Sequence, residues 1–312
     1  MTNQAQQYIK DDEIDLIDLF FTLWANKFKI ISFSLIISLI AIIYSLSLPN
    51  IYQSNAILSS SKTSGNNISN MASQYSGVAS LAGISLPSGQ EGDDVAKAIE
   101  IMKSLAFFSN LAEKENIFFE LQASNGWNSS NNALIIDPEK YDIKKNKWVS
   151  NQAFAQDGKP SLQSAHRDFL YNFDVSIDLK TRFVTISYRH YSPYIAKKVL
   201  DLVILEINSI SRAEDIKIAE DSIKFLTEEA SKTDFTEVKL GINNIIQKQI
   251  QTITLANASP DYLLEVLSEP SVPEVKFLPD RKFIVILSFI FGLLFSITFV
   301  LFKKFIVAKS SD

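Results

Sequence analysis

Two long apolar runs without charged residues dominate the hydropathy pattern of this 312-residue chain. They cover residues 30–48 and 283–302, and a basic residue stands directly before each run. At ~1.5 Å per residue, a helix of about twenty residues is ~30 Å long, which matches the hydrocarbon core of a bilayer. A buried core helix of this length would show one polar face, whereas these runs carry only a few small polar residues. The pattern therefore predicts two transmembrane helices.

Small residues form a stripe on each predicted span. In the second span they recur at every fourth position, at Ser288, Gly292 and Ser296. In the first span they follow one another at intervals of four, three and four residues, at Ser34, Ser38, Ala41 and Ser45. Such stripes lie on one side of a helix and let another membrane helix approach closely. We expect both stripes to be transmembrane packing faces.

The predicted spans divide the rest of the chain between the two sides of a membrane. Residues 49–282 would lie on one side, and the two tails, residues 1–29 and 303–312, on the other. Lysines near the spans favour a cytoplasmic location for the tails only slightly. The first span is too long for a signal-peptide core and is followed by no small-residue cleavage site, so we expect it to stay attached.

A short helix is predicted in the N-terminal tail, over residues 13–24. Its apolar residues share one face, which suits a helix that lies in the headgroup region and places Trp24 at the membrane interface. A simple extension of the first span would explain the same pattern equally well.

Between the spans, the pattern changes to that of an α/β domain. Alternating apolar and polar residues predict a β-hairpin with one buried face, and shorter apolar runs predict two further strands. The four strands are expected at residues 52–58, 173–179, 183–188 and 263–267. A helix is expected up to about Lys114, with Asp93 or Asp94 as its N-cap. Residues 59–92 and 123–160 are predicted as loops, the second of them pinned to the core by Trp127 and Trp148.

The longest element predicted outside the spans is a helix that begins at Pro193 and runs to about Ala230. A helix of this length is a rod of ~57 Å, so it must extend away from a compact base. Residues 233–235 interrupt it, and Asp234 with Glu237 has the form of an N-terminal cap for a return helix. The sequence thus predicts a long antiparallel helical arm over residues 193–258, followed by a proline-rich exit at residues 270–282.

The composition argues against an enzyme. A net charge of -5 offers no basic face for nucleic acid, and the absence of cysteine excludes disulfides and thiolate chemistry. The only histidines, His166 and His190, are predicted as surface residues. The acidic group Glu91, Asp93 and Asp94 lacks the ligand pattern of a calcium loop, and the formal glycosylation acceptor at residues 128–130 is predicted as plain loop. No catalytic, cofactor or metal site is predicted.

Three segments carry a resemblance to a known family. The motif Glu13-Ile14-Asp15-Leu16, with Trp24 before an apolar run, resembles the approach to the membrane in the Wzz-type chain-length determinants, or polysaccharide co-polymerases. Residues 77–84, followed by the helix at Lys103, are similar to the first extramembrane region of that family. The exit segment is similar to its proline-rich signature, which falls here on Pro270, Pro273, Lys276, Pro279 and Arg281.

The resemblance implies a membrane protein with two transmembrane helices flanking a periplasmic α/β base domain and a long antiparallel helical arm. It further implies an inner-membrane location in a Gram-negative bacterium, with both termini in the cytoplasm. Members of the family form ring-like homo-oligomers and set the length of O-antigen or related glycans, which a Wzy-type polymerase makes on undecaprenyl carriers. The short C-terminal tail contains no tyrosine, and the chain contains no nucleotide-binding loop. This favours the lipopolysaccharide branch over the capsule branch, which often includes or partners with a tyrosine kinase.

We therefore expect a non-enzymatic regulator of O-antigen chain length that acts as an oligomeric scaffold for the polymerase. One alternative is a co-polymerase or adaptor for capsule or exopolysaccharide export. Another is a two-span sensor whose outer domain binds a ligand or partner. In the expected function, the proline-rich exit and the stripe at Ser288, Gly292 and Ser296 would set the angle of the second span.

Overall fold

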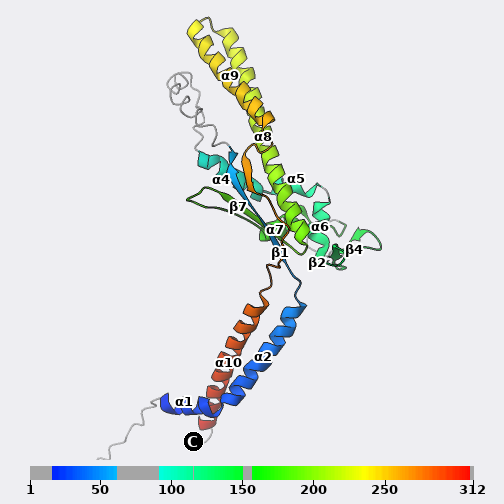
Figure 1. Cartoon of the computed structure of the whole chain (residues 1–312), viewed down its shortest axis with the longest axis vertical. Coiled ribbons are helices and arrows are strands. Elements are labelled where there is room, and N and C mark those ends of the chain that lie inside the picture. Colours follow the sequence, from blue (N-terminus) through cyan, green and yellow to red (C-terminus); the bar gives the residue numbers. More distant parts are fainter. Residues whose placement is uncertain (1–15, 62–90, 115, 150–156, 310–312) are drawn as a thin grey trace, which may run out of the picture. The chain divides into compact units, whose positions relative to one another are not determined.

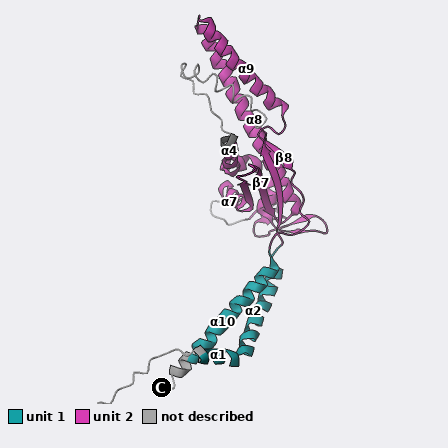
Figure 2. Ribbon diagram, turned by 60° about the vertical axis from the view of Figure 1, so that its left-hand side comes forward, with its two compact units in different colours: residues 1–49, 279–312 teal, residues 50–278 magenta. Residues whose placement is uncertain are grey.

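The computed structural model describes residues 16–61, 91–114, 116–149 and 157–309 (Figure 1). The chain forms two compact units, shown in different colours in Figure 2. Unit 1 combines the two ends of the sequence, Met1–Pro49 and Pro279–Asp312, and unit 2 is Asn50–Leu278. Two of the motifs that carry the family resemblance, residues 13–15 and 77–84, lie outside the described residues.

Unit 1 contains the helices α1 (Leu16–Ala25), α2 (Lys27–Ser47) and α10 (Arg281–Lys309). Helices α2 and α10 lie side by side (Figures 1 and 2). Among the described residues, Lys27–Ser47 and Arg281–Lys304 are long and apolar enough to cross a membrane. Helix α1 does not extend α2, because the helix is interrupted at Asn26 and α1 runs in a different direction (Figure 1). Lys304 Nζ of α10 donates a hydrogen bond to Thr22 Oγ1 of α1 over 2.7 Å.

A four-stranded antiparallel sheet forms the base of unit 2, with the strand order β6-β7-β1-β8. The strands are β1 (Tyr52–Ser60), β6 (Phe173–Ile177), β7 (Val184–His190) and β8 (Leu264–Ser268). The four predicted strands are therefore confirmed, and the predicted hairpin is β6 and β7, with Val175 opposite Ile186. Because β7 lies inside the sheet, most of its residues are buried.

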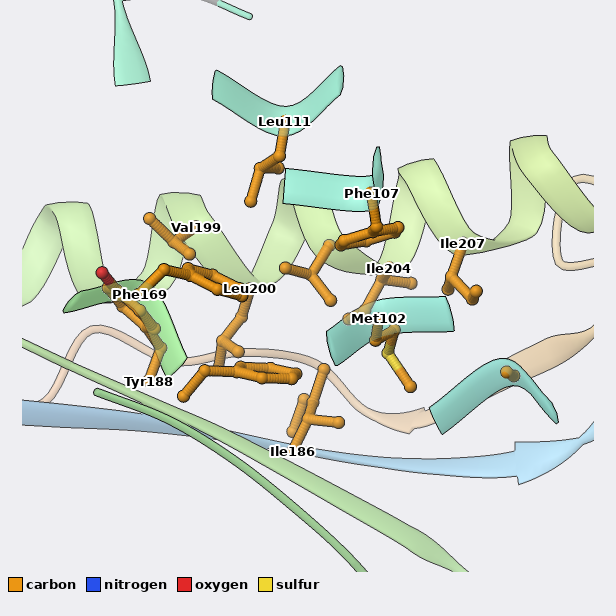
Figure 3. Close-up of a cluster of buried hydrophobic side chains, with 14 of the residues drawn as sticks. Met102, Phe107, Leu111, Phe169, Ile186, Tyr188, Val199, Leu200, Ile204 and Ile207 are labelled. Carbon is orange, nitrogen blue, oxygen red and sulfur yellow. The ribbon is translucent and has the colours of Figure 1, made fainter. Parts of the chain in front are cut away.

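Helices cover the sheet and enclose the core of unit 2 with it (Figure 3). They are α4 (Glu91–Lys103), α5 (Leu105–Ala112), α6 (Ile117–Ala123), α7 (Leu162–Asn172) and the first part of α8 (Pro193–Lys232). Ile186 and Tyr188 of the sheet lie within the same buried cluster as Leu200 of α8 and Phe107 of α5. Each such side chain contributes ~1.5–3 kcal/mol by leaving water.

The single helix predicted up to Lys114 is two helices. Ser104 is extended (φ -75°, ψ 153°), and its hydroxyl accepts a hydrogen bond from the Phe107 N–H over 3.1 Å. This side chain therefore ends α4 and caps α5. The prediction that Asp93 or Asp94 caps the helix is wrong, because both residues lie inside α4.

The loop predicted over residues 123–160 contains two short hairpins. One pairs β2 (Ser124–Asn128) with β3 (Ala133–Ile136), and the other pairs β4 (Tyr141–Asp142) with β5 (Lys147–Trp148). Asparagine enables both turns, because Asn132 and Asn146 adopt positive φ angles of 51° and 52° that asparagine tolerates well. Both tryptophans pack as predicted, with Trp127 against Tyr52 and Tyr194 and Trp148 against Phe118, Phe119 and Tyr141.

Helix α8 and the return helix α9 (Thr236–Ala258) form the predicted arm. Ser192 caps α8, and Pro193 occupies its first turn. Beyond the base the arm has only a thin apolar seam, in which Ala219, Leu226 and Ala256 are buried. The cap predicted at Asp234 is wrong: α9 begins one residue later than that cap requires, so Phe235 takes the cap position and makes no side-chain cap bond.

Asn208 ties α8 to the start of β8. Its side chain is buried, and Oδ1 accepts hydrogen bonds from the main-chain N–H groups of Leu263 and Leu264 at 2.8 and 2.9 Å. Its Nδ2 donates to the carbonyl of Leu264 at 3.0 Å. One polar side chain on α8 therefore holds the chain where it re-enters the sheet from α9.

Candidate functional site

The two predicted small-residue stripes face one another in unit 1. Ser34, Ser38 and Ser45 of α2 are buried, as are Gly292 and Ser296 of α10, and Ala41 and Ser288 are half-buried. A Cβ atom on Gly292 would lie 3.0 Å from Ser34 Cα and 3.4 Å from Ser34 Cβ. Hydrogen in place of a side chain at Gly292 therefore allows the closest approach of the two helices.

Ser34, Ser38 and Ser288 on these faces bond within their own helices. Ser34 Oγ donates to the Ile30 carbonyl at 2.9 Å, Ser38 Oγ to the Ser34 carbonyl at 3.0 Å and Ser288 Oγ to the Ile284 carbonyl at 2.7 Å, each within its own helix. These side chains matter at the interface because they are small, and van der Waals contact holds the pair together. The rings of Phe33 and Phe295 stack beside the stripes, with centroids 6.1 Å apart.

The outward surface of the helix pair consists of large apolar side chains. It includes Leu39, Ile40 and Ile43 on α2 and Phe291 and Phe295 on α10, each about 60% exposed. Since the small residues contact each other within the chain, a further helix that approaches this pair would meet leucine, isoleucine and phenylalanine.

The proline-rich segment lies along the start of β1. Ser54 Oγ donates to the Ser271 carbonyl at 2.7 Å, and Ile51 exchanges main-chain hydrogen bonds with Phe277 and Leu278 at 2.8 to 3.1 Å. The two chain ends of unit 2 are thereby joined to each other. Nothing in the sequence around Ile51 predicted this pairing, because a single bridge leaves no periodic pattern.

The residues predicted for the membrane exit fall in both units. Pro270 is buried in unit 2, where Pro273 and Lys276 are half-buried, and Pro279 and Arg281 belong to unit 1. Arg281 Nε donates to the Ser45 carbonyl at 3.1 Å. This carbonyl is in the last turn of α2, where a positive side chain also interacts favourably with the helix dipole. Arg281 therefore links the start of α10 to the end of α2, and like the stripe residues it contributes to the contact between these two helices.

His190 is buried, so the prediction of a surface residue is wrong for it. Its Nδ1 accepts the Ser192 N–H at 3.0 Å, and its Nε2 lies 3.2 Å from Ser124 Oγ, which donates to the Glu120 carbonyl at 2.8 Å. This network places the proton of the neutral ring on Nε2. A general base would need that nitrogen free to accept a proton from serine, so the arrangement supports the fold and does not activate Ser124.

Protonation of His190 is expected to destabilise the fold. Burial lowers the pKa of His190 from 6.5 to about 4. Between these values the unfolded chain binds the additional proton, so stability should fall as the pH drops from about 6.5 to about 4, by roughly 3 kcal/mol in total. Thermal unfolding of the full chain in mild detergent across this range measures the effect.

His190→Gln should flatten that pH dependence, while His166→Gln serves as the control. His166 is half-buried, with Nε2 2.8 Å from the Lys103 carbonyl. An equal slope in the wild type and in His190→Gln would contradict the assignment.

Among residues 16–61, 91–114, 116–149 and 157–309, no group of three or more acidic or histidine side chains is placed to hold a metal ion.

Comparison with known proteins gives a match to one protein family. Residues 12–115 match the model of the Wzz family, described as chain length determinant protein. The resemblance to the Wzz family is confirmed. The matched residues include α1, α2, β1, α4 and α5, and therefore the first apolar helix and the start of unit 2.

Solved structures of related proteins show a likeness at low identity. A full-length bacterial polysaccharide co-polymerase is 15% identical, with 96% of this chain and all of that chain covered and a TM-score of 0.41. A fragment of WzzB, a polysaccharide co-polymerase from Salmonella Typhimurium, is 11% identical, with 73% of this chain and all of the fragment covered and a TM-score of 0.28. None of the curated proteins compared with the chain matches it.

Proposed function

We propose that this chain is a non-enzymatic regulator of O-antigen chain length in lipopolysaccharide, acting as an oligomeric inner-membrane scaffold for a Wzy-type polymerase. The observation that carries the proposal is the match of residues 12–115 to the chain length determinant family. The two helices with the length and composition of membrane spans support it.

In this proposal α2 and α10 cross the inner membrane, unit 2 lies in the periplasm and both tails lie in the cytoplasm. Helix α1 lies in the headgroup region on the cytoplasmic side. Its exposed apolar residues suit this position, and Lys27 Nζ lies 4.0 Å from the ring centre of Trp24, so a cationic group accompanies the aromatic one. The exposed apolar side chains of α1 are Ile17, Phe20, Phe21 and Trp24.

Copies of the chain assemble into a ring through surfaces that one subunit leaves uncovered. The arm is the first candidate, because two helices cannot bury apolar residues on their outer sides. Phe235, at the turn of the arm, is 72% exposed. Large apolar side chains that are exposed on one surface are typical of protein interfaces. Other exposed apolar residues of the arm include Leu205, Ile218, Phe225, Val238, Leu240, Ile250 and Leu255.

The physical role of the scaffold is to keep the polymerase and its undecaprenyl-linked glycan close to a repeated surface. Membrane helices that hold the polymerase nearby raise its effective concentration at the ring. In this proposal the proline-rich exit and the stripe at Ser288, Gly292 and Ser296 set the angle of the second span, and this angle controls how subunits and polymerase pack.

Deletion of the gene tests the proposal. Lipopolysaccharide from the deletion strain should show a broad distribution of O-antigen lengths on a gel, and the reintroduced chain should restore a preferred length. Loss of all polymer would instead indicate a role in polymerisation or export. An unchanged lipopolysaccharide ladder with altered capsule or exopolysaccharide would favour the alternative role of an export co-polymerase.

A further inference from the structure

Three aromatic side chains gather at the end of unit 2 where its chain begins and ends. Tyr52 is the first residue of β1, Trp127 lies in β2 and Tyr194 lies in the first turn of α8. The ring centres of Tyr52 and Trp127 are 5.5 Å apart, and those of Trp127 and Tyr194 are 6.2 Å apart. Figure 1 shows β2 at the end of unit 2 from which β1 starts. We call these three residues the aromatic cluster.

The aromatic cluster is partly exposed. Tyr194 is 50% exposed, and Tyr52 and Trp127 are half-buried. The indole N–H of Trp127 donates to Asn132 Oδ1 at 2.9 Å, so the polar atom of this side chain has a partner within its own hairpin. The ring surfaces that remain uncovered are apolar and are held in place by their mutual contacts.

Two short stretches of main chain link unit 2 to the two apolar helices. Leu48 and Tyr52 are four residues apart, so the main chain between them spans at most ~14 Å, and Leu278 and Arg281 are joined by at most ~11 Å. The hydrogen bonds between Ile51 and Leu278 join the two tethers at the same point of unit 2. If α2 and α10 span a membrane, both tethers limit how far this end of unit 2 can move away from its surface.

Tryptophan and tyrosine are the side chains that prefer the boundary between hydrocarbon and water in a bilayer. We propose that the aromatic cluster of Tyr52, Trp127 and Tyr194 binds the phospholipid headgroup region of the membrane that α2 and α10 cross. This inference rests on the proposed membrane insertion. Because Tyr194 is in the first turn of α8, the contact sets the distance between the start of α8 and the membrane surface.

Tryptophan fluorescence tests the contact directly, because the chain has 3 tryptophans. The full-length variant Trp24→Phe/Trp148→Phe keeps Trp127 as its only tryptophan. It is placed in nanodiscs of phosphatidylcholine, with or without lipid that carries a nitroxide quencher on the headgroup. We expect roughly two-fold quenching of Trp127, since the nitroxide lies at the depth that tryptophan prefers.

A matched control places the only tryptophan at the other end of the arm. In the full-length variant Trp24→Phe/Trp127→Phe/Trp148→Phe/Phe235→Trp, the reporter is separated from Tyr194 by the 40-residue helix α8, about 60 Å long. Its fluorescence should not change with the nitroxide lipid. Equal quenching at Phe235→Trp and at Trp127 would overturn the proposal, because the signal would then not report on depth.

A third variant separates failure of this inference from failure of the proposed function. Trp127→Phe/Trp148→Phe keeps only Trp24, which should be quenched if α2 crosses the bilayer. Quenching of Trp24 without quenching of Trp127 would overturn the lipid contact and leave the spans intact. Absence of quenching at both would overturn both proposals. If the Trp127-only variant does not fold, the difference between Trp24→Phe and Trp24→Phe/Trp127→Phe gives the same result.

Discussion

Replacing Asn208 by leucine is expected to lower the free energy of unfolding of unit 2 by about 4 kcal/mol, since three buried main-chain groups lose their partner. These groups are the N–H groups of Leu263 and Leu264 and the carbonyl of Leu264. Leucine is larger than asparagine, so no cavity forms, and the lost hydrogen bonds, together with some overpacking, account for the cost. Urea unfolding of the full chain in mild detergent, followed by tryptophan fluorescence, measures the change.

Two further variants distinguish the hydrogen bonds from other effects at this position. Asn208→Asp keeps an acceptor for both N–H groups but loses the donor to Leu264, so its cost should be smaller than that of leucine. Asn257→Leu is the control, because this asparagine is exposed on α9 and donates a hydrogen bond to the Ile253 carbonyl of the same helix at 3.0 Å. A loss below about 1 kcal/mol in Asn208→Leu would mean that water or the main chain replaces the lost bonds.

Gly292→Leu is expected to separate α2 from α10 and to abolish control of glycan length. A Cβ atom at this position would already lie 3.0 Å from the main chain of Ser34, and leucine adds three further carbon atoms. Leucine has the better helix propensity, by about 0.8 kcal/mol, whereas overpacking of a tight contact costs ~1–3 kcal/mol. The clash therefore outweighs the gain, and the helices must move apart.

Cross-linking measures this separation. The chain contains no cysteine, so Phe33→Cys and Phe295→Cys provide a unique pair at positions whose rings stack in the wild type. Adding Gly292→Leu should lower the yield with a short bis-maleimide by about five-fold or more, as expected for a loss of at least 1 kcal/mol. Lipopolysaccharide gels of Gly292→Leu should show the broad length distribution of the deletion strain.

Gly241→Leu is the matched control. Gly241 lies in α9, and a Cβ atom there would meet nothing within 4 Å. The same substitution should leave the cross-link unchanged and should stabilise α9 slightly, because leucine replaces a flexible residue in a helix. Normal cross-linking together with normal glycan length in Gly292→Leu would refute the role of the close contact.

The contact at Gly292 also changes the interpretation of the stripes. The sequence predicted a packing face on each span but did not identify its partner, because spacing shows only which residues share a side of a helix. In the structure the two faces meet within one chain, and large apolar side chains lie outside. A polymerase that binds the helix pair is therefore expected to pack against the outward side chains, such as Ile43 and Phe291.

Local pattern alone determined much of this protein. The two apolar helices, the strands of the sheet and the 40-residue helix α8 followed from hydrophobic periodicity and from the position of Pro193, because each depends on residues close together in the sequence. The turn at Ser104 and the hairpins with Asn132 and Asn146 were missed, since one polar residue in an apolar run leaves several local structures open.

Tertiary structure decided which distant parts of the chain meet. Several features bring together residues that are far apart in the chain. They are the approach of Gly292 to Ser34, the hydrogen bond from Arg281 to Ser45, the packing that buries His190, and the bridge between Ile51 and Leu278. No periodic pattern in the sequence indicates such pairs, because the contacts that stabilise them form only after the helices and strands have packed. The sequence by itself therefore determined the apolar helices, the long arm and the strands of the main sheet, and packing determined which of their side chains meet.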